Sequence, residues 1–90
     1  MDRPLKTLRP LSDLKIGEQA FIVQLNYEVE DILAKRLFEL GFVPGALVEM
    51  MHRSPFHKGP MSFDIRSTQI ALRYEEAQRV LCKLKSEESL

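Results

Sequence analysis

Residues 36–45 read RLFELGFVPG and carry the most specific structural signals of the sequence. Gly41 directly follows an apolar, helix-forming run, at the place where helices commonly end on a residue in the left-handed conformation. Pro44 and Gly45 suit the centre of a type II turn, whose second central residue needs a positive φ. The stretch therefore predicts the end of a helix, a tight turn and the start of a strand.

The residues before this stretch predict one strand and one helix. Residues 19–25 (QAFIVQL) are almost continuously apolar, which is typical of a strand buried on both faces. Asn26 can cap the following segment. Apolar side chains then recur at helical spacing, at Val29, Ile32, Leu33, Leu37 and Leu40. We therefore expect a helix over about residues 28–40 with a single apolar stripe.

The residues after the turn predict short strands. They lie at 47–53, 61–66, 69–72 and 81–84, with a brief helix at 75–80. In residues 61–66 apolar and polar side chains alternate, as in a strand with one buried face. The sequence thus predicts a small closed barrel of about five strands, with one helix between the first two strands and a short helix before the last. Closure would remove the sheet edges.

The chain of 90 residues has room for one small domain. We assign residues 1–10 to a loosely packed lead-in, 11–84 to the domain and 85–90 to a frayed tail. Its 13 basic and 13 acidic residues balance, which argues against general binding of nucleic acid or anionic membranes. One cysteine, no signal peptide and no apolar run of about 20 residues predict a cytoplasmic protein without direct membrane insertion.

The chain contains no motif of a catalytic site. It has no phosphate-binding glycine loop and no nucleophile elbow, and Cys82 at a strand edge is a poor nucleophile, so we expect no enzyme activity and no cofactor. His52, His57 and Asp64 are possible metal ligands. They lack the spacing of structural zinc sites, so solvated side chains are the simpler interpretation and we assign no metal site.

Arginine and lysine gather between residues 50 and 73. Arg53, Lys58, Arg66 and Arg73 face a single acidic residue, Asp64, in this part of the chain. Strand alternation alone would place these cations in water, which is the simpler explanation. The other reading is a patch that docks an acidic protein surface or a nucleic-acid strand. Because aromatic side chains are not interleaved with the cations, we expect no nucleic-acid partner.

Two residues of the predicted helix break its pattern. Arg36 falls inside the apolar stripe and Phe38 points away from it. Arg36 can cover core carbons with its stem and pair with Glu39 or a strand carboxylate, which we favour, or offer its guanidinium to a partner. Phe38 is either covered by the N-terminal lead-in, the slightly preferred reading, or exposed as an interface anchor.

The order of these motifs resembles the ferrous iron transport protein A (FeoA) family. The resemblance rests on residues 36–45, Val48, residues 54–56, Gly59-Pro60 and residues 71–77, and it spans about residues 11–84. The same module is similar to the C-terminal SH3-like domain of iron-dependent repressors. One departure is the loop at residues 55–60, which is one residue longer than usual in the family and more basic.

The resemblance implies an SH3-like barrel and an accessory role beside the membrane ferrous iron transporter FeoB. Such a protein would dock on the cytosolic, G-protein-like part of FeoB and modulate its GTPase activity or its assembly. Our candidate contacts are the helix and the loop: Arg36, Phe38, Pro55, Phe56, His57 and Lys58. The alternative is a metal-responsive SH3-like module that holds a transition metal ion near His52, His57 and Asp64.

Overall fold

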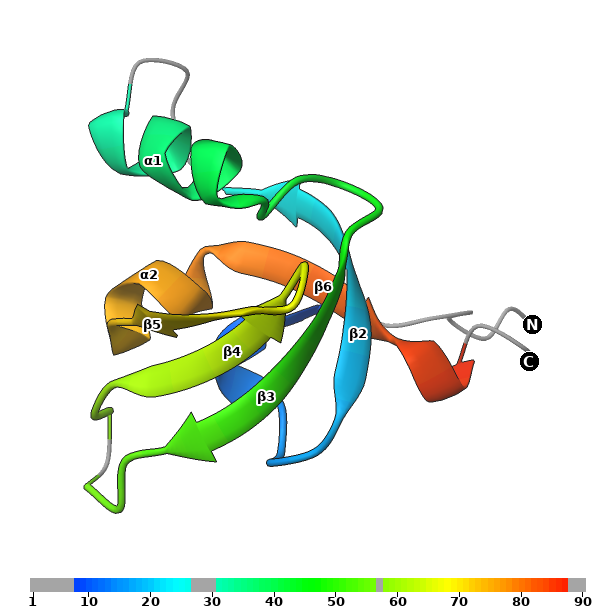
Figure 1. The fold of residues 1–90 in the computed structure, drawn as a ribbon, viewed down its shortest axis with the longest axis vertical. Coiled ribbons are helices and arrows are strands. Elements are labelled where there is room, and N and C mark those ends of the chain that lie inside the picture. Colours follow the sequence, from blue (N-terminus) through cyan, green and yellow to red (C-terminus); the bar gives the residue numbers. More distant parts are fainter. Residues whose placement is uncertain (1–7, 27–30, 57, 88–90) are drawn as a thin grey trace, which may run out of the picture.

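The strands of this chain form one antiparallel sheet. The computed structural model describes residues 8–26, 31–56 and 58–87. Within them the strands are β1 (Arg9–Pro10), β2 (Gln19–Leu25), β3 (Leu47–Arg53), β4 (Met61–Ile65), β5 (Thr68–Leu72) and β6 (Val80–Leu84). The helices are α1 (Ile32–Leu40) and α2 (Tyr74–Gln78), with 3-10 turns η1 (Leu11–Asp13) and η2 (Lys85–Glu87). Figure 1 shows the curved sheet with α1 at one end of the molecule.

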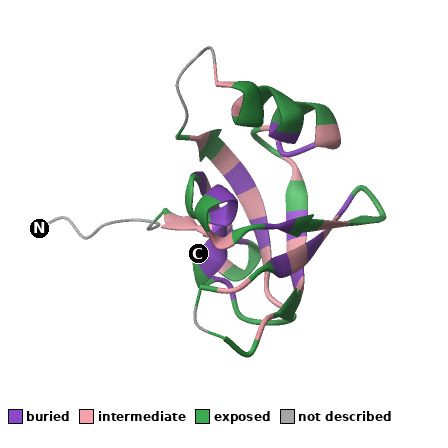
Figure 2. Ribbon diagram, turned by 90° about the vertical axis from the view of Figure 1, so that its left-hand side faces the viewer, coloured by how far each residue is buried: buried purple, intermediate pink, exposed green. Residues whose placement is uncertain are grey.

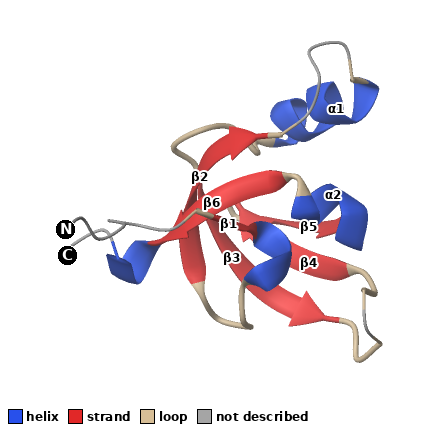
Figure 3. Ribbon diagram, turned by 180° about the vertical axis from the view of Figure 1, so that it is seen from behind, coloured by secondary structure: helices blue, strands red, loops and turns tan. Residues whose placement is uncertain are grey.

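The sheet has the SH3-like arrangement that the sequence predicted. Its strand order is β1-β6-β2-β3-β4-β5 (Figure 3). The predicted closure of the barrel is wrong, because β1 and β5 are the two outer strands and no ladder joins them in the described residues. α2 and η1 pack against each other beside the end strands. This contact covers the core where a closing strand pair would otherwise lie.

The ordered structure extends beyond the expected domain at both ends. Arg9 and Pro10, assigned to the lead-in, pair with Cys82 and Leu81 of β6 and add a sixth strand. At the other end, η2 follows β6 directly and takes up the first three residues of the predicted tail, of which residues 88–90 lie outside the described part of the chain. Arg9 Nη2 lies 3.4 Å from Glu87 Oε2, so the two ends of the described chain are joined by an ion pair.

β2 is buried on one face, in contrast to the expectation of burial on both. Ala20 and Ile22 are buried, whereas the residues between and beside them are half-buried or exposed. On the other face Phe21 and Val23 are half-buried, so these apolar side chains remain partly in water. A continuous apolar run therefore overstated the burial of this strand.

α1 begins later than the sequence predicted. Its N-cap is Asp31, whose Oδ1 accepts a hydrogen bond from Leu33 N at 2.8 Å, so Asn26 does not cap it. The predicted start at residue 28 lies outside the described residues. α1 ends as predicted at Gly41, which has a φ of 111°, and Gly45 has the positive φ, 92°, that the turn needs.

One hairpin sets the boundary between β4 and β5. Arg66 and Ser67 have φ values of 53° and 63°, the left-handed pair of a type I′ turn, so β4 ends at Ile65 and β5 begins at Thr68. The predicted alternation in β4 is confirmed, with Met61, Phe63 and Ile65 buried. These residues belong to a core drawn from every strand except β1 and from both main helices. Its largest buried side chains are Phe42, Phe63, Leu11, Leu14, Ile22 and Leu37.

Candidate partner-binding surface

α1 exposes most of its apolar side chains. Only Leu37 of this helix is buried, while Ile32 is 83% exposed, Phe38 57% and Leu33 40%. Figure 2 shows the helix lying apart from the sheet, with exposed residues over most of its surface. The apolar stripe predicted from helical spacing is therefore buried at Leu37 and half-buried against the core at Leu40, but open to solvent at Ile32 and Leu33. The preferred reading of Phe38 as a covered residue is wrong.

A few contacts hold α1 in place. Leu37 and Phe42, at its C-terminal end, are fully buried in the core. The side chain of Arg66 lies against Gly41, so close that a Cβ on this glycine would sit 3.3 Å from Arg66 Cδ. Arg36 Nη1 lies 3.4 Å from Glu76 Oε2 on α2. A second ion pair lies at the start of the helix, where Arg79 Nη1 is 3.9 Å from Oδ2 of the N-cap Asp31. The helix is thus fixed by core packing at its C-terminal end and by two partly exposed ion pairs.

Glu76 is the buried acidic side chain of this region. It is 7% exposed, and its Oε1 accepts a hydrogen bond from Arg73 N at 2.8 Å, which caps the start of α2. Its Oε2 faces Arg36, so the expected pairing of Arg36 with Glu39 or a strand carboxylate is wrong. Glu76 was not among the residues selected from the sequence. Only half of the usual signal was present, because the capping pattern pairs such a glutamate with Ser, Thr, Asp or Asn at the N-cap, where this chain has Arg73.

The loop between β3 and β4 presents a second exposed aromatic ring. Phe56 is 78% exposed. The loop is tied by hydrogen bonds from Phe56 N to Ser54 Oγ at 3.1 Å, and from Gly59 N to Phe56 O at 3.0 Å. Lys58 Nζ lies 5.7 Å from the centroid of the Tyr74 ring. Pro55 is exposed, and the candidate His57 lies outside the described residues.

The predicted contact residues fall into two separate groups. Arg36 and Phe38 lie on α1, whereas Pro55, Phe56 and Lys58 lie on the β3–β4 loop. Helix and loop occupy opposite ends of the longest axis of the molecule, at the top and the bottom of Figure 1. One flat partner surface would therefore not touch both groups. We call the first group, together with Ile32 and Leu33, the helix surface.

The basic stretch does not form one open patch. Arg53 Nη2 donates hydrogen bonds of 2.6 Å to Ser12 O and to Leu14 O, so this guanidinium ties β3 to the η1 turn. Arg66 packs on Gly41 at the other end of the sheet. Strand alternation placed these cations outside the core as predicted, but their contacts are mostly structural.

Side chains suited to metal binding are scattered in the described part of the chain. It contains no group of three or more histidine, cysteine, aspartate or glutamate side chains placed to share an ion. His57 lies outside it. Cys82 is fully buried, its Sγ donates to Arg9 O at 3.3 Å, and burial raises the pKa of the thiol to about 12. Cys82 is therefore a packed, protonated side chain at neutral pH.

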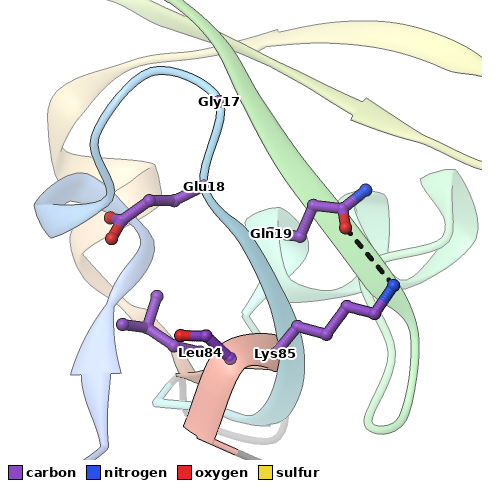
Figure 4. A pocket seen from close by; sticks show the side chains of 6 residues that line it. Gly17, Glu18, Gln19, Leu84 and Lys85 are labelled. Carbon is purple, nitrogen blue, oxygen red and sulfur yellow. Dashed lines mark hydrogen bonds between the residues drawn. The ribbon is translucent and has the colours of Figure 1, made fainter.

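A shallow pocket near the chain ends gathers few reactive groups. It is lined by Gly17, Glu18, Gln19, Leu84, Lys85 and Ser86 (Figure 4). Lys85 Nζ donates to Gln19 Oε1 at 3.4 Å, and Glu18 Oε1 accepts from Lys15 N at 2.8 Å. Glu18, Gln19 and Lys85 thus already have partners within the chain. Among the described residues, no helix has the length and apolarity needed to span a membrane.

Comparison with known proteins identifies relatives of this chain. Residues 9–84 match the FeoA domain family. A Porphyromonas gingivalis protein, named as a fusion of Fe(2+) transport protein A with the Fe(2+) transporter FeoB, is 32% identical over 74 residues. This match covers 82% of our chain but 8% of the fusion protein.

Two solved structures share both sequence and fold. Stenotrophomonas maltophilia FeoA, solved with zinc and described as a prokaryotic SH3 domain protein, is 35% identical with a TM-score of 0.72, covering 81% of our chain and 87% of that one. Iron(II) transport protein A from Clostridium thermocellum is 31% identical with a TM-score of 0.77, covering 86% and 46%.

A more distant structure shares the fold alone. A manganese-dependent transcriptional repressor is 17% identical with a TM-score of 0.77, covering 90% of our chain and 44% of the repressor. The predicted similarity to repressor domains is thereby confirmed at the level of the fold. The family match spans nearly the whole domain and agrees with the six-stranded SH3-like sheet. This chain belongs to the FeoA family.

Proposed function

We propose that this chain is an accessory protein of ferrous iron uptake that docks on the cytosolic part of FeoB and modulates its GTPase activity or its assembly. The observation that carries the proposal is the fusion protein, in which a FeoA part 32% identical to this chain shares one polypeptide with FeoB. A covalent tether holds two modules at an effective concentration of about millimolar, which favours partners that must meet.

The surface of the chain supports a binding role. Phe38 and Phe56 are exposed aromatic side chains on ordered elements, and rings of this kind are common anchors of protein interfaces. We propose that the chain works in the cytoplasm as a binding protein, without catalysis or a resident cofactor. Its contact with a larger partner would be small, below about 1,200 Å² of buried surface.

Binding to the complete transporter tests this function. FeoB in lipid nanodiscs would be titrated with the full chain in the presence of GDP, a non-hydrolysable GTP analogue or no nucleotide. We expect micromolar binding that changes with nucleotide. Phe38→Ala should weaken it at least tenfold, whereas Ile16→Ala, which removes an exposed side chain elsewhere, should leave it unchanged. Absence of binding in every nucleotide state would contradict the proposal.

The second candidate function is metal response. It is favoured by the 35%-identical relative that was solved with zinc. In our chain His52 and Asp64, on neighbouring strands β3 and β4, are the described ligand types from the predicted set. Equilibrium dialysis of the full chain against iron(II) and zinc separates the two functions. Stoichiometric retention of metal that His52→Ala abolishes would favour the metal-responsive module.

A further inference from the structure

β5 ends the sheet with an open edge. Ile65 pairs with Thr68 across a two-residue turn, so Thr68, Ile70 and Leu72 form the hydrogen-bonded pairs with β4. The main-chain groups of the intervening residues, Gln69 and Ala71, therefore point away from the sheet. Both residues are exposed. Within the described ranges, neither makes a main-chain hydrogen bond on that side.

A groove lies beside the C-terminal part of this edge, at Ala71. It lies between α1, β5 and α2 and is lined by Leu33, Arg36, Ala71, Arg73, Glu75 and Glu76. Leu33 supplies an apolar wall. Two contacts hold α1 above the edge: the Arg36–Glu76 ion pair, and the packing of Arg66 on Gly41. The groove is thus already formed in the free chain, and an incoming segment would not have to open it.

Cations flank the edge at both ends. Arg66 comes two residues before β5, and Arg73 follows it directly. Arg36 lines the groove and is half-exposed, so part of its guanidinium remains available to a ligand. The buried Glu76 is engaged with Arg36 and with the main chain of α2, which leaves Glu75 as the exposed carboxylate of the groove. The rim therefore favours an acidic occupant.

We propose that β5 accepts an extended segment of a partner protein as a seventh strand. The segment would have five to seven residues, apolar near its centre and acidic near both ends. Its main chain would bond to Gln69 and Ala71, which is the mode called β-strand addition. This inference goes beyond docking on FeoB, because it concerns main-chain recognition and holds for whichever protein carries the segment.

A synthetic peptide tests the proposal without any transporter. The probe is a fluorescein-labelled heptapeptide that alternates valine with threonine and has glutamate at both ends. Titrated into the isotope-labelled full chain, it should shift the amide resonances of Gln69 and Ala71 more than those of Thr68 and Ile70. Replacing both glutamates by lysine should weaken binding at least fivefold.

Two variants at position 71 separate the contribution of the main-chain N–H from that of the side chain. Ala71→Pro removes the outward N–H and fits an edge strand, where proline is tolerated when its nitrogen faces away from the ladder. Ala71→Val keeps the N–H. We expect Ala71→Pro to weaken peptide binding at least tenfold and Ala71→Val to change it less than threefold. Matching thermal unfolding of the two variants would exclude misfolding as the cause.

N-methylation of the peptide provides the decisive control. Methyl groups on alternate amides should abolish binding in one register and leave it within threefold in the other, because one side of a strand faces the sheet. Equal tolerance of both patterns would overturn the proposal, and so would failure of the probe to bind. Sedimentation of the peptide-free chain tests whether a second copy of the chain occupies the edge instead. A dimer that Ala71→Pro abolishes would also overturn the proposal.

Discussion

At the scale of the single residue, Glu76 links two parts of the molecule. One carboxylate oxygen caps α2 and the other faces Arg36 on α1. The two interactions differ in setting, because the cap is buried while the Arg36 side chain is 52% exposed. A buried hydrogen bond to a charged acceptor is usually worth more than an exposed ion pair, which water screens.

Substitutions at these two residues should therefore have unequal effects. Glu76→Ala removes the cap and should lower the free energy of unfolding by about 1–3 kcal/mol. Arg36→Ala removes only the ion pair and should cost less than about 1 kcal/mol. Urea unfolding followed by circular dichroism measures both. Equal losses would mean that the ion pair, and not the cap, gives Glu76 its importance.

Because Cys82 is buried, the free energy of unfolding should decrease at alkaline pH. Burial raises the pKa of its thiol from the ordinary 9.0 to about 12. Between these values the unfolded chain loses the proton and the folded chain keeps it. The free energy of unfolding is therefore unaffected below about pH 8 and falls as pH rises above 9, by at most about 1.4 kcal/mol per pH unit.

Urea midpoints at pH 7.5 and pH 10 measure this dependence. Cys82→Ala should be less stable at both pH values because it leaves a small cavity. Its midpoint should nevertheless fall less between the two pH values than that of the natural chain. A parallel fall in both proteins would show that other groups cause the alkaline loss.

At the scale of the element, α1 has two halves with different roles. Leu37 is fully buried and Ile32 is 83% exposed, although both fit one helical stripe in the sequence. Leu37→Ala should lower the free energy of unfolding by about 2–5 kcal/mol, a large part of the stability of a small domain. Ile32→Ala should change it by less than about 0.5 kcal/mol. Thermal unfolding of the pair gives the comparison.

The same helix marks the limit of what the sequence could predict. Its end at Gly41 and the turn at Gly45 follow from local backbone preferences, so both were predicted correctly. The exposure of Ile32 depends on how far the sheet extends beneath the helix, which no local pattern encodes. β1 was missed for a related reason, because two residues gain strand geometry only through pairing with β6.

The candidate site was predicted in part. Arg36, Phe38 and Phe56 were selected from the sequence, and the structure leaves all three accessible. The separation of helix and loop could not be predicted, since it depends on the tertiary arrangement. The buried role of Glu76 was hard to predict, because its N-cap partner is Arg73 and not one of the usual capping residues.

For the molecule as a whole, a covalent linker between this chain and FeoB should compensate for weakened docking between them. If Phe38→Ala weakens docking tenfold, joining this variant to FeoB by a flexible linker should restore the effect on GTP hydrolysis, because the local concentration then exceeds the weakened dissociation constant. GTPase assays of the linked and separate proteins measure this. A defect that persists in the linked protein would place Phe38 in the regulatory step itself.

The ion pair between Arg9 and Glu87 brings both ends of the described chain together, on a different side of the molecule from α1. Chain ends that lie close together are easily joined to other polypeptides, whether before, after or within them. Gene fusion at either end would leave the helix surface and the open edge of β5 unobstructed. The architecture thus suits a domain that can be joined to other polypeptides, as the FeoA part of the Porphyromonas gingivalis protein is joined to FeoB.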